Sequence, residues 1–278
     1  MEHNWSHFNQ KGWCFLDSNA EHHQWIDSAK ASIVKKFDQR KYKKSDFRSG
    51  ATWFTGINFL DNGPNGDING KPFSSEIWFE ISEKFGSEVK YWDAAQVSIC
   101  WKGYPIKDSL ESENSFRYRL KRYSSHLDGL IPVGQKKRRF AKEFHAFILG
   151  IPLLNNSVDA APLVVWEGSH IIFRDIFRRV YSGLSESEIS ALDVTEIYHK
   201  YRKEVFSSCC TRKVVPYKNQ PYILDRHLLH GVVPWKEDIN SSSIPYEDNA
   251  LRLNPMTGRI VTYFRPPHED PTDWVVQD

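Results

Sequence analysis

Three side chains of this sequence have the chemistry and spacing of metal ligands. His126 and Asp128 lie two residues apart in Ser124-Ser125-His126-Leu127-Asp128-Gly129-Leu130, and His230 follows about 100 residues later. Side chains alternate along a strand, so His126 and Asp128 are expected to point to one face. If the strand of His230 faces them, the three form a two-histidine, one-carboxylate triad that holds Fe(II) and leaves three positions open.

Both histidines also have an ordinary structural interpretation. A His-x-Asp triplet arises often by chance, so His126 is alternatively a strand histidine bonded to a carbonyl, and His230 a satisfied core histidine. His145, His170 and His227 are reserve candidates. Among these, His170 follows Gly168-Ser169 and is expected to order that turn or border the pocket. His227 has the opposite strand parity to His230 and is expected to face away.

The last apolar strand carries two arginines on one face. In Arg259-Ile260-Val261-Thr262-Tyr263-Phe264-Arg265, residues 259, 261, 263 and 265 point the same way. A guanidinium inside an apolar barrel needs an anion. Arg259 is therefore a candidate for holding the far carboxylate of a dicarboxylate bound at the metal. Arg265, directly before a proline, is expected to pair with an internal Asp or Glu.

Short β-rich runs in the C-terminal two thirds must position these residues. No regular helix separates most of them, which favours an antiparallel double sheet, mainly β with flanking helices, in the double-stranded β-helix (jelly-roll, cupin-like) class. The expected strands are Ala95–Trp101, Ser124–Leu130, Phe144–Leu154, Pro162–Trp166, Lys213–Leu224, Leu228–Trp235 and Arg259–Arg265.

Helices are expected around this core. Apolar residues recur at helical spacing over 20–38 after Ser18-Asn19, and a second helix is expected over Ser75–Phe85 beyond a turn-rich loop. Capping-box patterns beginning at Ser185 and Asp193 place a helical insertion at about 173–206. Nothing marks a domain boundary, so residues 1–278 are expected to form one domain, with an N-terminal part, 1–92, packing on a core, 93–278.

Composition removes several classes of function. Lys+Arg 37 against Asp+Glu 35 gives a net charge of +2, which provides no electrostatic reason to expect nucleic acid or a membrane surface as partner. No apolar run is long enough for a membrane span, and the first residues lack a signal-peptide pattern. The 4 cysteines suit neither a disulfide framework nor a zinc site. These features predict a cytoplasmic protein acting on a small molecule.

Over most of its length the sequence resembles the phytanoyl-CoA dioxygenase-like branch of the Fe(II)/2-oxoglutarate-dependent oxygenases. The opening stretch His7–Leu16 followed by a helix is similar to the family's N-terminal strand and helix. The matching motifs follow in the family's order: His126-Leu127-Asp128-Gly129, Trp166-Glu167-Gly168-Ser169-His170, His230-Gly231 and Arg259.

The resemblance implies a hydroxylase. Fe(II) would be held by His126, Asp128 and His230, and 2-oxoglutarate by Arg259. With O2, the enzyme would hydroxylate an unactivated C–H bond of a small molecule and release succinate and CO2. Halogenating relatives replace the carboxylate by a small residue, so Asp128 favours hydroxylation or a related oxidation.

The sequence also departs from the family pattern. Arg259 follows His230 by 29 residues rather than about ten, so the polar stretch Glu237–Gly258 is interpreted as an inserted loop. Val232 and Val261 stand where many relatives have a hydroxyl residue that contacts the co-substrate. Gln96 and Arg119 are candidates for this second contact, and an ordinary surface role is the alternative for both.

Two other classes of function compete with the oxygenase. A cupin-type metalloenzyme without co-substrate would prefer more histidine ligands and would not need Arg259. A non-catalytic jelly-roll binding module is suggested by 10 Trp and 12 Tyr that could stack on sugars.

Basic residues flank the His-x-Asp segment. This basic cluster consists of Arg117, Arg119, Lys121, Arg122, Lys136, Lys137, Arg138 and Arg139. A solvated face is the common origin of such a run. The sharper hypothesis is that the cluster attracts an anionic substrate.

Overall fold

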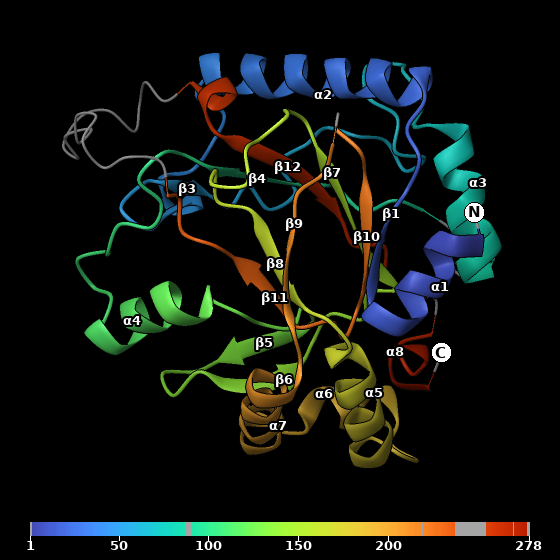
Figure 1. Ribbon diagram of the computed structural model, residues 1–278, viewed down its shortest axis with the longest axis vertical. Coiled ribbons are helices and arrows are strands. Elements are labelled where there is room, and N and C mark those ends of the chain that lie inside the picture. Colours follow the sequence, from blue (N-terminus) through green and yellow to red (C-terminus); the bar gives the residue numbers. More distant parts are fainter. Residues whose placement is uncertain (1, 87–90, 218, 237–253, 269, 277–278) are drawn as a thin grey trace.

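The computed structural model describes residues 2–86, 91–217, 219–236, 254–268 and 270–276, and its centre is two antiparallel sheets (Figure 1). The larger sheet has seven strands in the order β1-β10-β7-β12-β4-β3-β2, and the smaller has the order β11-β8-β9. A separate hairpin joins β5 and β6. The strands are β1 (Trp13–Phe15), β2 (Phe47–Arg48), β3 (Trp53–Phe54), β4 (Gln96–Cys100), β5 (Leu130–Val133), β6 (Arg138–Ala141), β7 (Phe147–Pro152), β8 (Leu163–Trp166), β9 (Thr211–Val214), β10 (Tyr222–Asp225), β11 (His230–Val232) and β12 (Arg259–Phe264).

The chain passes repeatedly between the two sheets, which makes the fold a jelly roll. After β4 in the large sheet, His126 pairs with His230, the first residue of β11 in the small sheet. The chain then returns to β7, crosses to β8 and β9, returns to β10, crosses to β11 and returns to the large sheet in β12. The predicted mainly β, double-stranded β-helix class is therefore confirmed.

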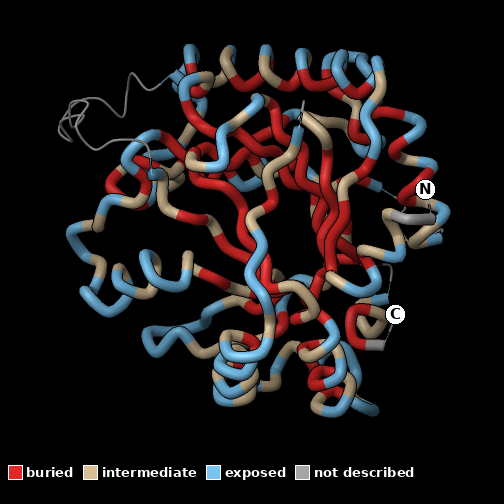
Figure 2. Tube along the Cα trace, viewed as in Figure 1, coloured by how far each residue is buried: buried red, intermediate tan, exposed pale blue. Residues whose placement is uncertain are grey.

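Helices surround the two sheets. They are α1 (Glu2–Lys11), α2 (Ala20–Asp38), α3 (Ser75–Phe85), α4 (Glu113–Arg122), α5 (Ser169–Val180), α6 (Glu186–Ala191), α7 (Thr195–Ser208) and α8 (Asp273–Val276). The apolar side chains of α2 and α3 pack with the outer face of the large sheet, and those of α5, α6 and α7 with that of the small sheet. A third apolar cluster, which includes Leu163, Val165, Val261 and Tyr263, fills the space between the sheets. Figure 2 shows the result, a buried β-core inside exposed helix faces.

The expected helices are present. Asn19 caps α2 by accepting a hydrogen bond from the His22 backbone nitrogen at 2.9 Å. The insertion predicted at 173–206 consists of α5, α6 and α7, and Ser185 and Glu188 form the predicted capping box. The second capping box is wrong, because Asp193 accepts from Thr195, only two residues later, and α7 begins after Val194.

Two predicted strands, Ser124–Leu130 and Lys213–Leu224, are interrupted in the structure. Ser124–Leu130 is not a continuous strand: positive φ angles at Tyr123 (57°), Ser124 (52°) and Gly129 (85°) bend the chain on both sides of His126. Within 124–130, His126 alone forms a β-bridge with β11. Lys213–Leu224 is likewise divided between β9 and β10.

The N-terminal segment and the described part of 237–258 differ from the predictions. In His7–Leu16 only β1 is extended, because α1 continues to Lys11 and Gly12 has a φ of 85°. Of the predicted inserted loop, 237–253 lies outside the described residues, and Pro255–Thr257 forms a 3-10 turn. Among the described helices none is both long and apolar enough to cross a membrane.

A buried histidine makes folding sensitive to acid. His227 is fully buried, and its ring lies against Trp274 at a centroid distance of 4.5 Å. Neither ring nitrogen has a hydrogen-bond partner in the described ranges of the chain. Burial and then Arg226 hold the pKa of His227 well below its usual 6.5. The same direction holds for His22 and His230, whose pKa values burial lowers to about 4.

We therefore expect metal-free protein to lose stability as the pH falls below about 6.5. The unfolded chain binds protons there while the folded chain excludes them, and each such histidine contributes up to about 1.4 kcal/mol per pH unit. Denaturant unfolding of wild type and His227→Leu between pH 7 and 5 measures the slope. The variant should show a shallower loss, and equal slopes would contradict the assignment to His227.

Candidate metal centre

Pairing between the segment of His126 and β11 brings the two triad histidines together. The backbone nitrogen of His126 donates to the His230 carbonyl at 2.9 Å, and that of His230 donates to the His126 carbonyl at 3.1 Å. Their ring centroids lie 4.6 Å apart. Residues 104 positions apart in the sequence thus become direct neighbours.

Each of these histidines has its Nδ1 nitrogen committed to the backbone. His126 Nδ1 lies 2.9 Å from the Ser124 carbonyl, and His230 Nδ1 lies 2.9 Å from the Leu228 carbonyl. A carbonyl only accepts, so both Nδ1 atoms carry the proton and both Nε2 atoms keep a lone pair in the neutral ring. Burial lowers the pKa of His230 to about 4, which keeps its ring neutral at pH 7.

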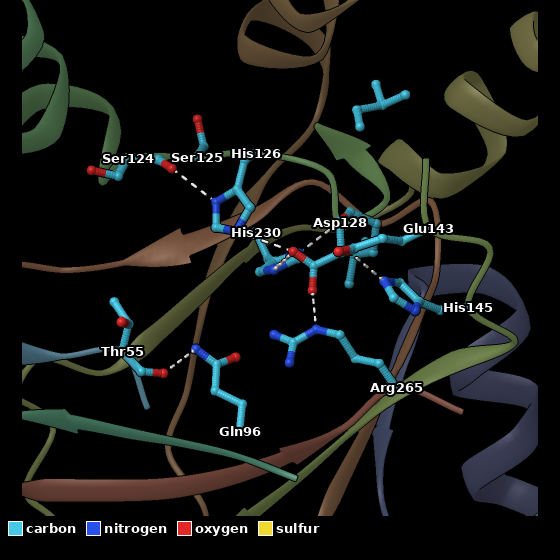
Figure 3. A network of polar contacts seen from close by, with 12 residues as sticks. Thr55, Gln96, Ser124, Ser125, His126, Asp128, Glu143, His145, His230 and Arg265 are labelled. Atoms are coloured by element: carbon cyan, nitrogen blue, oxygen red, sulfur yellow. Dashed lines mark hydrogen bonds and ion pairs between the residues drawn. The ribbon is translucent and has the colours of Figure 1, made fainter. Parts of the chain in front are cut away.

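The third triad residue turns one carboxylate oxygen toward both rings. Asp128 Oδ1 lies 3.2 Å from His126 Nε2 and 3.6 Å from His230 Nε2 (Figure 3). One ligand atom from each of the three residues lies within 4.8 Å of the others. Three potential ligand atoms that converge in this way form a candidate site for a cation.

Arg265, which is expected to pair with an internal acid, contacts Asp128. Arg265 Nε donates to Asp128 Oδ2 at 2.6 Å, which confirms the expected pairing with an internal acid. Burial alone would raise the pKa of the Asp128 carboxyl, but Arg265, with help from His230 and His126, outweighs burial and holds that pKa well below its usual range. Asp128 is thus an anion at any pH near neutrality.

Two glycines allow the segment of His126 and Asp128 to lie close to its neighbours. Gly129, with a φ of 85°, turns the chain after Asp128, and a Cβ there would collide with the Glu143 carbonyl. A Cβ on Gly231 would collide with the Tyr123 carbonyl oxygen, which accepts from Val232 at 3.0 Å. Gly231 therefore sets how closely His126 approaches His230.

Gly231→Ala is expected to destabilise the fold by about 1–3 kcal/mol, because backbone must move to admit the methyl group. The displaced 123–126 segment carries His126, so metal affinity should fall as well. Denaturant unfolding and an anaerobic metal titration measure the two effects. Unchanged values in both would show that the pairing of these segments tolerates the methyl group.

A serine from another element fixes the backbone just before His230. Ser169, the first residue of α5, accepts a hydrogen bond from the Leu229 backbone nitrogen at 2.9 Å, and both groups are buried. The Gly168-Ser169-His170 motif was singled out in the sequence for its histidine, and this contact of Ser169 was missed. The motif itself was the available signal, but its partner is 60 residues away.

Arg259 lies between the sheets with an unused donor. It is 4% exposed, its Nη2 donates to the Tyr263 hydroxyl at 3.2 Å, and its Nη1 has no hydrogen-bond partner among the described residues. Tyr263 in turn accepts from the Tyr222 hydroxyl at 3.0 Å. A buried guanidinium nitrogen without a partner is costly, so this end of the interior fits a carboxylate ligand.

Gln96 and Arg119 occupy different positions relative to the triad. Gln96 faces the site in Figure 3, with its amide nitrogen donating to the Thr55 carbonyl at 2.7 Å. Arg119 lies on α4 and donates to Glu111 Oε1 from two nitrogens, at 2.9 and 3.3 Å. A contact of either residue with a co-substrate stays a prediction, and for Arg119 Glu111 already supplies a carboxylate.

The three reserve histidines lie outside the metal cluster. His170 Nε2 contacts the Asn9 carbonyl at 3.1 Å, so it joins α5 to α1. His145 lies 3.4 Å from Glu143, and His227 packs in the apolar cluster with Phe177 and Trp274.

The basic cluster is partly occupied by structural contacts. Arg138 forms ion pairs with Asp193 at 2.5 Å and Glu196 at 2.8 Å, and Arg139 donates to the Leu130 carbonyl. Lys136 and Lys137 are exposed on the β5–β6 turn. These contacts favour a solvated face that braces α6 and α7.

Comparisons with known proteins give only distant likenesses. No protein-family model matches the sequence. No curated protein matches it either. Among solved structures, EvdMO1 has a TM-score of 0.49 and 13% identity, covering 95% of this chain and 50% of its own, so this chain spans about half of that protein.

Two further structures cover more of their own length. AviO1 from Streptomyces viridochromogenes Tue57 has a TM-score of 0.44 and 12% identity, covering 96% of this chain and 95% of its own. EctD from S. alaskensis with bound Fe has a TM-score of 0.43 and 11% identity, covering 100% of this chain and 81% of its own. At these values the likenesses assign no chemistry to this chain.

Proposed function

We propose that this protein is an Fe(II)- and 2-oxoglutarate-dependent oxygenase, a hydroxylase of the phytanoyl-CoA dioxygenase-like branch. The observation that carries the proposal is the convergence of His126 Nε2, His230 Nε2 and Asp128 Oδ1, whose ligand atoms lie within 4.8 Å. Two imidazoles and one carboxylate on one side of a cation, with the other positions open, are typical of non-haem Fe(II) sites in oxygenases.

The interior between the sheets supports 2-oxoglutarate as the co-substrate. Arg259 Nη1 is buried and forms no hydrogen bond within the part of the chain that the structure describes, and the Tyr263 hydroxyl lies beside the same guanidinium. A carboxylate there would accept from both groups. Tyr263 is thus our candidate for the hydroxyl contact that Val232 and Val261 do not supply.

The residues of this chain then have separate tasks. The triad holds the metal, and Arg259 orients the far carboxylate of the co-substrate in a space that apolar side chains shield from water. Bound iron and 2-oxoglutarate would supply oxidative decarboxylation, giving succinate and CO2, coupled to hydroxylation of a substrate C–H bond. His126, whose side chain is 43% exposed, marks the open side for a small-molecule substrate.

The proposal is tested by product formation. Purified protein is incubated with Fe(II), 2-oxoglutarate and O2, with and without a metabolite extract, and succinate is quantified by mass spectrometry. Succinate that requires Fe(II) and O2, together with a +16 product from the extract, is expected. Iron-dependent oxidation of the extract without 2-oxoglutarate consumption would instead favour the cupin-type metalloenzyme.

A further inference from the structure

The two oxygens of Asp128 have different neighbours. Oδ1 faces the two Nε2 atoms, at 3.2 and 3.6 Å, whereas Oδ2 accepts from Arg265 Nε at 2.6 Å. Charge-assisted hydrogen bonds of this length are among the strongest that a carboxylate makes in proteins. The lone pair of Oδ2 that accepts this hydrogen bond is therefore engaged by Arg265, whereas Oδ1 faces the cation site.

Arg265 is itself held in place. Its backbone nitrogen donates to Asp93 Oδ1 at 2.7 Å, and its guanidinium lies 5.2 Å from the centre of the Tyr263 ring. The side chains of Arg265 and Asp128 are only 20% and 11% exposed, so little water competes with their contact. The neighbouring carboxylate, Glu143, lies 3.4 Å from His145 instead (Figure 3).

We propose that Arg265 is a positioning residue that restricts Asp128 to a one-oxygen ligand. A carboxylate can bind a cation through one oxygen or through both. Through both, Asp128 would fill a fourth position of a six-coordinate metal. Through one, it leaves three positions open, as many as a chelating 2-oxo acid and O2 need together. That a 2-oxo acid and O2 fill the open positions rests on the proposed function. The number of Asp128 oxygens that bind the metal can be measured without them.

The test uses the full chain loaded anaerobically with Ni(II) alone. Crystal structures of the wild type and Arg265→Gln show how many Asp128 oxygens reach the metal, and calorimetry gives the metal stoichiometry. The wild type should bind one metal through Oδ1, with Arg265 still on Oδ2. Arg265→Gln should still bind one metal, but through both oxygens.

Two further variants separate positioning from a general loss of charge. Arg138→Gln removes an arginine that pairs with carboxylates outside the site, and it should leave the coordination unchanged. Arg265→Lys keeps a cation and should restore the one-oxygen mode at least in part. Addition of 2-oxoglutarate to the metal-loaded proteins should show an affinity about 10- to 100-fold weaker for Arg265→Gln, the range in which loss of such an outer partner lowers metal affinity or activity.

Two results would overturn the inference. One is a wild-type metal complex in which both Asp128 oxygens contact the metal, which decides the matter even if Arg265→Gln does not fold. The other is one-oxygen binding in Arg265→Gln. Failure of wild-type protein to bind 2-oxoglutarate would count against the proposed function. The metal-only structures would still show whether Arg265 restricts Asp128 to one-oxygen binding.

Discussion

Alanine in place of His230 or Asp128 is expected to reduce Fe(II) binding from one ion per chain to nearly none. Each change removes one of three ligands, and the remaining two do not define a facial site. Asp128→Ala also leaves Arg265 without the carboxylate that it contacts at 2.6 Å, so two cations would then repel across the site. Anaerobic calorimetric titration of Fe(II) measures the stoichiometry.

His145→Ala is the matched control for this experiment. His145 is buried near the site beside Glu143, but it does not belong to the metal cluster. Its removal should leave the stoichiometry at one. Full retention of iron in both His230→Ala and Asp128→Ala would mean that another group of residues holds the metal.

Arg259→Met is expected to weaken 2-oxoglutarate binding strongly while leaving Fe(II) binding nearly intact. The methionine keeps much of the buried volume but removes the guanidinium, whose Nη1 forms no hydrogen bond with any described residue. Loss of one desolvated charge-assisted contact costs roughly 2 to 5 kcal/mol, which is about 30- to 4,000-fold in dissociation constant. Titration of 2-oxoglutarate into Fe(II)-loaded protein without O2 measures this dissociation constant.

Tyr263→Phe serves as the graded comparison, since it removes only one neutral hydroxyl. We expect an increase of about fivefold in the dissociation constant, because a neutral hydrogen bond contributes about 1 kcal/mol. If Arg259→Met bound 2-oxoglutarate as tightly as the wild type, the co-substrate carboxylate would have to lie elsewhere in the interior.

The triad could be predicted from the sequence because His126 and Asp128 lie only two positions apart. Only their pairing with His230 is long-range. Two residues separated by a buried Leu127 share a face whether they lie in a regular strand or in the bent segment that the structure shows. Period-two alternation likewise placed Arg259 and Tyr263 together inside the roll. These predictions needed only the direction of side chains along extended backbone.

Contacts between distant segments could not be predicted in the same way. The sequence indicated an acidic partner for Arg265, but its identity as Asp128 depends on how the end of β12 lies against a segment 137 residues earlier. The hydrogen bond from Leu229 to Ser169 depends on the start of α5 meeting β11. Helix α4 was missed because none of its residues is buried, so it has no apolar face for a pattern to reveal.

The most direct test of the proposed oxygenase is a titration of 2-oxoglutarate into three anaerobic samples: wild type without metal, wild type with Fe(II), and His230→Ala with Fe(II). If the triad presents open positions on iron and Arg259 receives the far carboxylate, only Fe(II)-loaded wild type should bind one 2-oxoglutarate per chain with high affinity. Equal binding in all three samples, or none in any, would contradict this assignment of the site.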